Sequence, residues 1–107
     1  MEVAVHRIEY KDSKTLFTEL HFVIACDRIS HKDLINVRLA NENAAETFRN
    51  SATRILKAMK RDGTIKLFVF ESDINNTEKT EVVYLLNKFP ELSDITDENP
   101  NSIFVKL

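Results

Sequence analysis

The sequence of 107 residues contains one glycine, one cysteine and two prolines, and it has no tryptophan. Phosphate-cradling loops of nucleotide-binding proteins need several glycines at fixed spacing, so this whole class of site is excluded. A single cysteine, Cys26, excludes an intramolecular disulfide and the cysteine pairs of structural zinc sites. We therefore expect a cytoplasmic protein with no cofactor and no metal.

Long apolar runs and a strong charge of one sign are also missing. No stretch approaches the length of a membrane span, and the alternating polarity of residues 1–7 is unlike a signal peptide. The net charge is −2, which gives no general attraction to nucleic acid. The charge is uneven, because residues 41–70 hold six basic and three acidic side chains, whereas residues 71–107 hold three and eight. Two segments of opposite net charge attract one another, either within one chain or between two copies of it.

The chain is long enough for one domain with a hydrophobic core, since 43% of its residues are hydrophobic. Apolar residues alternate along 3–10 and again along 16–24, on either side of a polar turn at 11–14. This pattern predicts a β-hairpin. Residues 30–40 are ambiguous: alternation favours a third strand, but a short helix capped by residues 30–33 stays open.

The helical period is clearest from about residue 43 to residue 62, where one stripe is apolar and the opposite side is charged. Gly63 follows as a left-handed helix cap. Residues 64–71 predict a strand with apolar residues on both faces, typical of the middle of a sheet. A second helix is expected over 75–89, ended by Pro90, and a last strand over 102–107.

These elements predict a single α+β domain over residues 1–107, with the order β-β-β-α-β-α-β. The five strands form a mixed sheet, the strands at 64–71 and 102–107 lie parallel, and two amphipathic helices cover the sheet. This element order is similar to a truncated ribonuclease H-like fold. The resemblance is one of topology alone, and it implies no activity.

The charged face of the helix at 43–62 is a candidate binding surface. Its five cations can meet phosphates or an acidic protein: Arg49, Arg54, Lys57, Lys60 and Arg61. Glu46 interrupts the patch, and no aromatic residue stands among the cations to stack on a base. Nucleic-acid binding through this face is therefore one alternative function.

A second alternative is a small enzyme with a site near His6, His21 and Cys26. The two histidines lie on neighbouring strands of the predicted hairpin, and Arg28 or His31 favours the thiolate of Cys26. The competing interpretation is that the two histidines are half-buried strand residues and that Cys26 is a small buried side chain.

The sheet edges offer another route to partners. The N-terminal strand or the strand at 30–40 is expected to end the sheet with unpaired backbone groups, and Val5, Phe17 and Val23 would add apolar area. We therefore expect a non-catalytic interaction or regulatory domain that binds a protein partner or a second copy of itself, and no membrane.

Overall fold

The computed structural model describes residues 3–94 and 99–107. The helices and strands of this part follow one another as β1 (Ala4–Ile8), α1 (Ser13–Ile29), β2 (Leu34–Leu39), α2 (Ala45–Asp62), β3 (Leu67–Phe70), α3 (Thr80–Lys88) and β4 (Ser102–Lys106). Short 3₁₀ helices join them: η1 (Glu42–Ala44), η2 (Glu71–Asp73) and η3 (Pro90–Asp94). The prediction of an α+β domain with a mixed sheet is confirmed.

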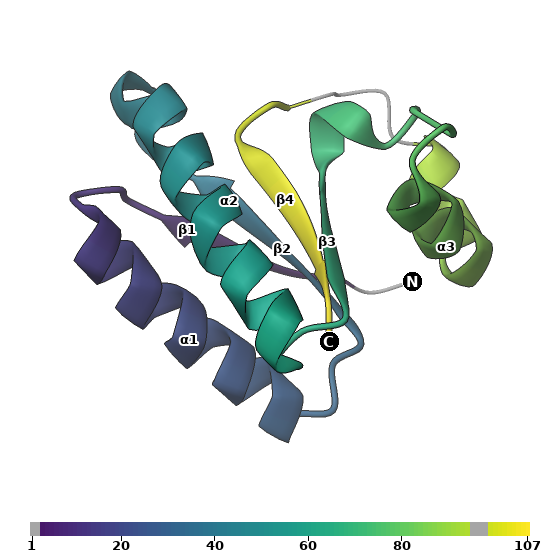
Figure 1. The fold of residues 1–107 in the computed structure, drawn as a ribbon, viewed down its shortest axis with the longest axis horizontal. Helices are drawn as coiled ribbons and strands as arrows, with labels where there is room; N and C mark the ends of the chain where they lie inside the picture. Colours follow the sequence, from purple (N-terminus) through teal and green to yellow (C-terminus); the bar gives the residue numbers. More distant parts are fainter. Residues whose placement is uncertain (1–2, 95–98) are drawn as a thin grey trace.

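The sheet has the strand order β1-β2-β4-β3, in which β1 and β2 are parallel and β4 runs antiparallel to both of its neighbours. Helices α1 and α2 lie side by side across one face, and α3 lies on the other side of β3 (Figure 1). One core cluster joins α1 and α2 to Ile35, Val37 and Val105. A second joins α3 and η3 to the opposite face, through Val69 and Phe104.

The predicted second strand, residues 16–24, is wrong: these residues belong to helix α1. Leu16, Leu20 and Ile24 satisfy a two-residue alternation, but they also stand four residues apart and form the buried stripe of a helix. The Asp12 carboxylate caps this helix by accepting a hydrogen bond from the Thr15 backbone N–H at 2.7 Å. The hairpin and the fifth strand are therefore absent from the described residues, which contain three α-helices and four strands. The ribonuclease H-like topology is not confirmed.

The predicted strand within residues 30–40 is confirmed as β2, which lies inside the sheet and not at an edge. The expected parallel pairing of the strands at 64–71 and 102–107 is wrong, because β3 and β4 are antiparallel. Phe70 at the end of β3 pairs with Ile103 near the start of β4, so the chain leaves β3 and enters β4 at the same end of the sheet. Strand β3 is an edge strand, and its apolar residues occupy both faces because α2 and α3 cover one face each.

Both predicted helices exist, with different starting points. Helix α2 covers nearly the whole of the predicted 43–62 segment. Helix α3 begins at Thr80 and not near Asn75, since the Asn76 side chain caps a turn by accepting from the Glu78 backbone N–H at 3.3 Å. No helix in the described part of the chain is long and apolar enough to cross a membrane.

Gly63 ends α2 in the left-handed conformation, with a φ of 84°, as predicted. A Cβ at this position would meet no atom within 4 Å, so only the backbone angle opposes a larger residue. Replacing Gly63 with alanine is expected to lower the free energy of unfolding by about 1 kcal/mol, measured by urea denaturation. Gly63→Asn should lose less, because asparagine tolerates this region better. Equal stability of wild type and Gly63→Ala would contradict this explanation of the helix end.

Candidate functional site

Strand β1 forms an open edge of the sheet. The Ile8 carbonyl accepts a hydrogen bond from the Ala40 backbone N–H at 2.8 Å, so the backbone groups of Ile8 point toward β2. Backbone groups alternate sides along a strand, and those of Val5 and Arg7 therefore point away from β2. In residues 3–94 and 99–107, no strand pairs with that side. Of the two strands expected to end the sheet, the N-terminal strand does so and the strand within residues 30–40 does not.

A groove of about 490 Å³ runs between this edge and helix α1. Its lining consists of Val5, His6, Arg7, Ile8, Thr18, Glu19, Phe22 and Val23. Phe22 is 69% exposed and Val5 is 51% exposed. A phenylalanine exposed to this degree beside an unpaired strand edge is typical of a contact surface.

Helix α1 extends this apolar area along its outer side. Phe22, Cys26 and Ile29 stand at i, i+4 and i+7, which places them along one line of the helix. Ile29 is 79% exposed, and Cys26 is exposed too, so the interpretation of Cys26 as a buried side chain is wrong. We call the set Val5, Arg7, Phe22, Val23, Cys26 and Ile29 the β1–α1 surface. Val5 and Val23 were predicted for this role and line the groove, whereas Phe17, the third predicted residue, does not line it and lies against His21. Phe22 was not predicted, because the pattern placed it on the same strand face as Leu16, Leu20 and Ile24.

The residues of the enzyme alternative do not share one cleft in the described structure. His6 lines the groove, with its Nε2 2.5 Å from Asp27 Oδ2. The His21 ring lies against the Phe17 ring, with centroids 4.2 Å apart, and no contact joins it to His6 or Cys26 among the described residues. No group of three or more histidine, cysteine, aspartate or glutamate side chains in those residues is placed to hold a metal ion.

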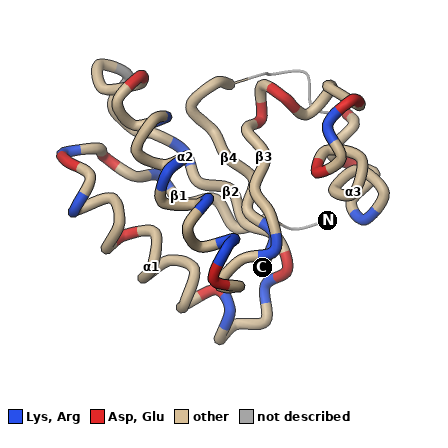
Figure 2. The backbone as a smooth tube through the Cα atoms, in the orientation of Figure 1, with Lys and Arg blue, Asp and Glu red and all other residues tan. Residues whose placement is uncertain are grey.

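The cations of α2 are partly engaged by neighbouring side chains. Arg54 donates to Ser13 Oγ at 3.2 Å, and Lys60 forms a 3.0 Å ion pair with Glu81. Lys57 and Arg61 are exposed. Figure 2 shows basic positions along α2, with acidic positions at both of its ends. The predicted basic face exists, but it is weaker than the sequence alone indicates.

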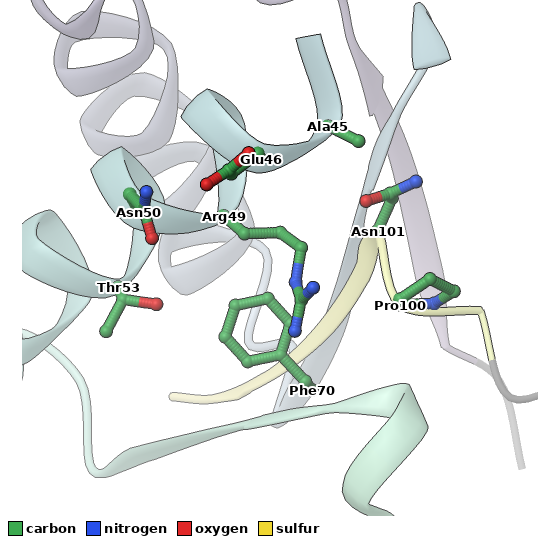
Figure 3. Close-up of a pocket in the computed structure, with 8 residues that line it drawn as sticks. All are labelled: Ala45, Glu46, Arg49, Asn50, Thr53, Phe70, Pro100 and Asn101. Atoms are coloured by element: carbon green, nitrogen blue, oxygen red, sulfur yellow. The ribbon is translucent and has the colours of Figure 1, made fainter. Parts of the chain in front are cut away.

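Arg49, the remaining cation, lies in a separate pocket of about 560 Å³ between α2 and the ends of β3 and β4 (Figure 3). The pocket is lined by Ala45, Glu46, Arg49, Asn50, Thr53, Phe70, Pro100 and Asn101. The Arg49 guanidinium carbon lies 5.6 Å from the centroid of the Phe70 ring. The fold thus brings an aromatic ring to the basic helix from a strand 21 residues away, a feature that no local signal in the sequence reveals.

A chain of polar side chains crosses the face of the sheet opposite α1 and α2. Asn36 donates to Ser102 Oγ at 2.7 Å, and Arg38 donates to Asn36 Oδ1 at 2.8 Å. Arg38 also forms a 3.3 Å ion pair with Glu71, which is only 2% exposed and accepts from the Asn99 backbone N–H at 2.8 Å. Both oxygens of the Glu71 carboxylate have a hydrogen-bond partner within the protein, so we assign this row of polar side chains a structural role.

Lowered pKa values occur at Tyr10 and Asp12, beside the start of α1, and at Asp62, at the end of α2. Hydrogen bonds from Ser13 and Ser51 lower the pKa of Tyr10. The hydrogen bond from the Thr15 backbone N–H lowers the pKa of Asp12. The cap of α1 therefore stabilises the fold fully at a pH above the ordinary aspartate pKa, and this stabilisation is lost as the pH falls through the lowered pKa. The Thr64 hydroxyl lowers the pKa of Asp62 in the same way.

None of these groups lines the groove or the pocket. Two surface features of the described structure remain as candidate sites, the open strand edge with its exposed apolar side chains and the polar pocket around Arg49. Comparison with protein-family models, with curated proteins and with solved structures finds no match to this chain.

Proposed function

We propose that this chain is a non-catalytic interaction domain that acts through the β1–α1 surface, and that its partner there is a second copy of the chain. The observation that carries the proposal is the unpaired edge of β1 beside the exposed Phe22 ring. Strand edges of this kind bind a further strand through backbone hydrogen bonds.

The sequence of β1 suits antiparallel pairing with itself. A two-fold axis through His6 places Val5 opposite Arg7 of the partner subunit, and both residues have outward backbone groups. Such a pair exchanges two hydrogen bonds, and symmetry doubles the number. Val5 then lies against the aliphatic stem of the partner's Arg7, so no like charges lie directly opposite. Each His6 retains Asp27 of its own chain as a partner.

The same axis brings the two α1 helices alongside one another. Phe22 and Val23 line the groove together with His6, so they lie near the axis and would be buried between the helices. A contact along the roughly 25 Å of α1 buries about 1,000 Å² in total, the low end for a specific interface. We therefore expect a reversible dimer of modest affinity.

The two alternatives have less support. Nucleic-acid binding would use a helix on which two of the five cations, Arg54 and Lys60, already have partners. An enzyme near His6, His21 and Cys26 would need these residues to converge, and the described contacts hold His6 and His21 to different neighbours.

Changing Phe22 to glutamate is expected to weaken the dimer by at least about 30-fold, since a central aromatic residue of an interface contributes about 2 kcal/mol or more. Size-exclusion chromatography with light scattering measures this directly. The wild type should approach twice the monomer mass of 12.4 kDa as concentration rises, whereas the variant stays near that mass.

The matched control is Tyr84→Glu, which charges another exposed aromatic residue, on α3, away from the β1–α1 surface. This variant should dimerise as the wild type does. A wild type that remains monomeric at all concentrations would contradict the proposal, as would equal loss of dimer in both variants.

A further inference from the structure

The pocket between α2 and β3 contains polar groups that form no hydrogen bond or ion pair with the described part of the chain. Neither Arg49 nor Glu46 forms an ion pair in the described part of the chain, although both line the pocket. The Oδ1 atom of Asn101 is buried and accepts no hydrogen bond from residues 3–94 or 99–107. Figure 3 shows these residues around one space, with Arg49 lying over the Phe70 ring.

The position of Arg49 suits it to bind an anionic group. Its contact with Phe70 holds the planar guanidinium against the ring, which restricts the side chain and leaves its N–H groups free to donate. A carboxylate matches this geometry, because its two oxygens can each accept a hydrogen bond from one N–H group of the guanidinium. This half of the pocket therefore favours a ligand with a carboxylate.

The position of Asn101 calls for a donor on the ligand. Its backbone N–H is held by Asn99 Oδ1 at 2.9 Å, and its carbonyl accepts from the Leu39 backbone N–H at 3.0 Å. The backbone of this residue is thus held just before β4, and Figure 3 shows its side-chain oxygen on the side of Arg49. A buried acceptor without a donor is costly, so a donor group on a ligand would relieve this cost.

Glu46 decides between the possible ligands. Its carboxylate repels a phosphate dianion, and Arg49 repels a simple cation. A ligand with a carboxylate and an ammonium group on neighbouring atoms meets all three requirements. We propose that the pocket binds a free α-amino acid, with its carboxylate on Arg49 and its ammonium group between Glu46 and the Oδ1 atom of Asn101. The volume of about 560 Å³ lies within the range of small-molecule sites.

Titration of the ¹⁵N-labelled protein, followed by nuclear magnetic resonance, tests this proposal. L-alanine, L-glutamine and L-glutamate are added separately, and acetate, methylamine and inorganic phosphate serve as partial ligands. At least one amino acid should shift the Arg49 Nε–H and Asn101 Nδ2 signals in a saturable way, with an affinity about tenfold or more above that of each partial ligand. Absence of a saturable shift for all three amino acids, or tighter binding of phosphate, would overturn the proposal.

Substitutions on helix α2 test which side chains bind the amino acid. Arg49→Gln and Glu46→Gln should each weaken binding of the amino acid about tenfold or more, because each removes one charged partner. Arg61→Gln, on the exposed side of α2, should leave the affinity unchanged. If Arg61→Gln weakens binding of the amino acid equally, the effect is a nonspecific one of charge, and the proposed site is wrong. The pocket lies apart from the β1–α1 surface, so the titration can also be made on Phe22→Glu, and neither outcome depends on dimer formation.

Discussion

Replacing Phe48 with alanine is expected to lower the free energy of unfolding by about 3 to 5 kcal/mol, the largest loss among the single changes considered. The Phe48 side chain is fully buried between α2 and the sheet, and its ring and the Tyr10 ring form a T-shaped pair with centroids 6.4 Å apart. Its removal leaves a cavity that the packed helix cannot close. Urea denaturation, with the slope of the transition compared between variants, measures the loss.

Two controls isolate the cause. Phe48→Leu keeps most of the volume and should lose about 1.5 kcal/mol or less. Phe17→Ala removes a phenylalanine that is half exposed on α1, and it should change stability by about 0.5 kcal/mol. Equal effects at Phe17 and Phe48 would contradict the assignment of α2 to the core.

Replacing Glu71 with alanine is expected to cost about 3 kcal/mol of stability. The change leaves Arg38 without its carboxylate and removes the acceptor of the Asn99 backbone N–H, in a region where Glu71 itself is almost fully buried. Arg38 is about one third exposed, so water partly compensates for the loss. Thermal or urea denaturation at neutral pH gives the value.

Glu71→Gln keeps an acceptor and a similar shape, and we expect about half of that loss. The matched control is Glu81→Ala, which removes the partner of Lys60 in an exposed ion pair and should change stability by about 0.5 kcal/mol or less. If Glu71 and Glu81 behave alike, the buried polar chain does not stabilise the fold.

The sequence predicts those parts of the fold whose patterns are local and undisturbed. Helix α2 keeps its charged residues apart from its apolar stripe, and Gly63 marks its end. Helix α1 was not predicted because Phe17 and Phe22 are apolar residues on its exposed sides, and within residues 16–24 they mask the helical period of the buried stripe. Phe22, one of these two residues, belongs to the β1–α1 surface.

Strand order was not predictable from local patterns. The sequence of β3 predicts a central strand because both of its faces are apolar. In the structure β3 is an edge strand, and both faces are apolar because a helix packs on each of them. The polar chain from Asn36 to Glu71 and the pocket of Arg49 and Phe70 join residues far apart in the sequence. No spacing rule connects them, so only the fold reveals them.

The two proposed sites lie at opposite edges of the sheet. Dimer formation through β1 would leave β3 and the pocket beside it exposed on each subunit. The arrangement therefore allows an assembled dimer to bind one small ligand per subunit.

Hydrogen exchange of the Val5 and Arg7 backbone amides tests the central claim most directly, because these amides are open in the monomer and paired in the proposed dimer. We predict that their exchange slows as the wild-type concentration rises, and that it stays fast in Phe22→Glu at every concentration. Exchange of both amides that is equally fast in dilute and concentrated wild-type protein would contradict the account.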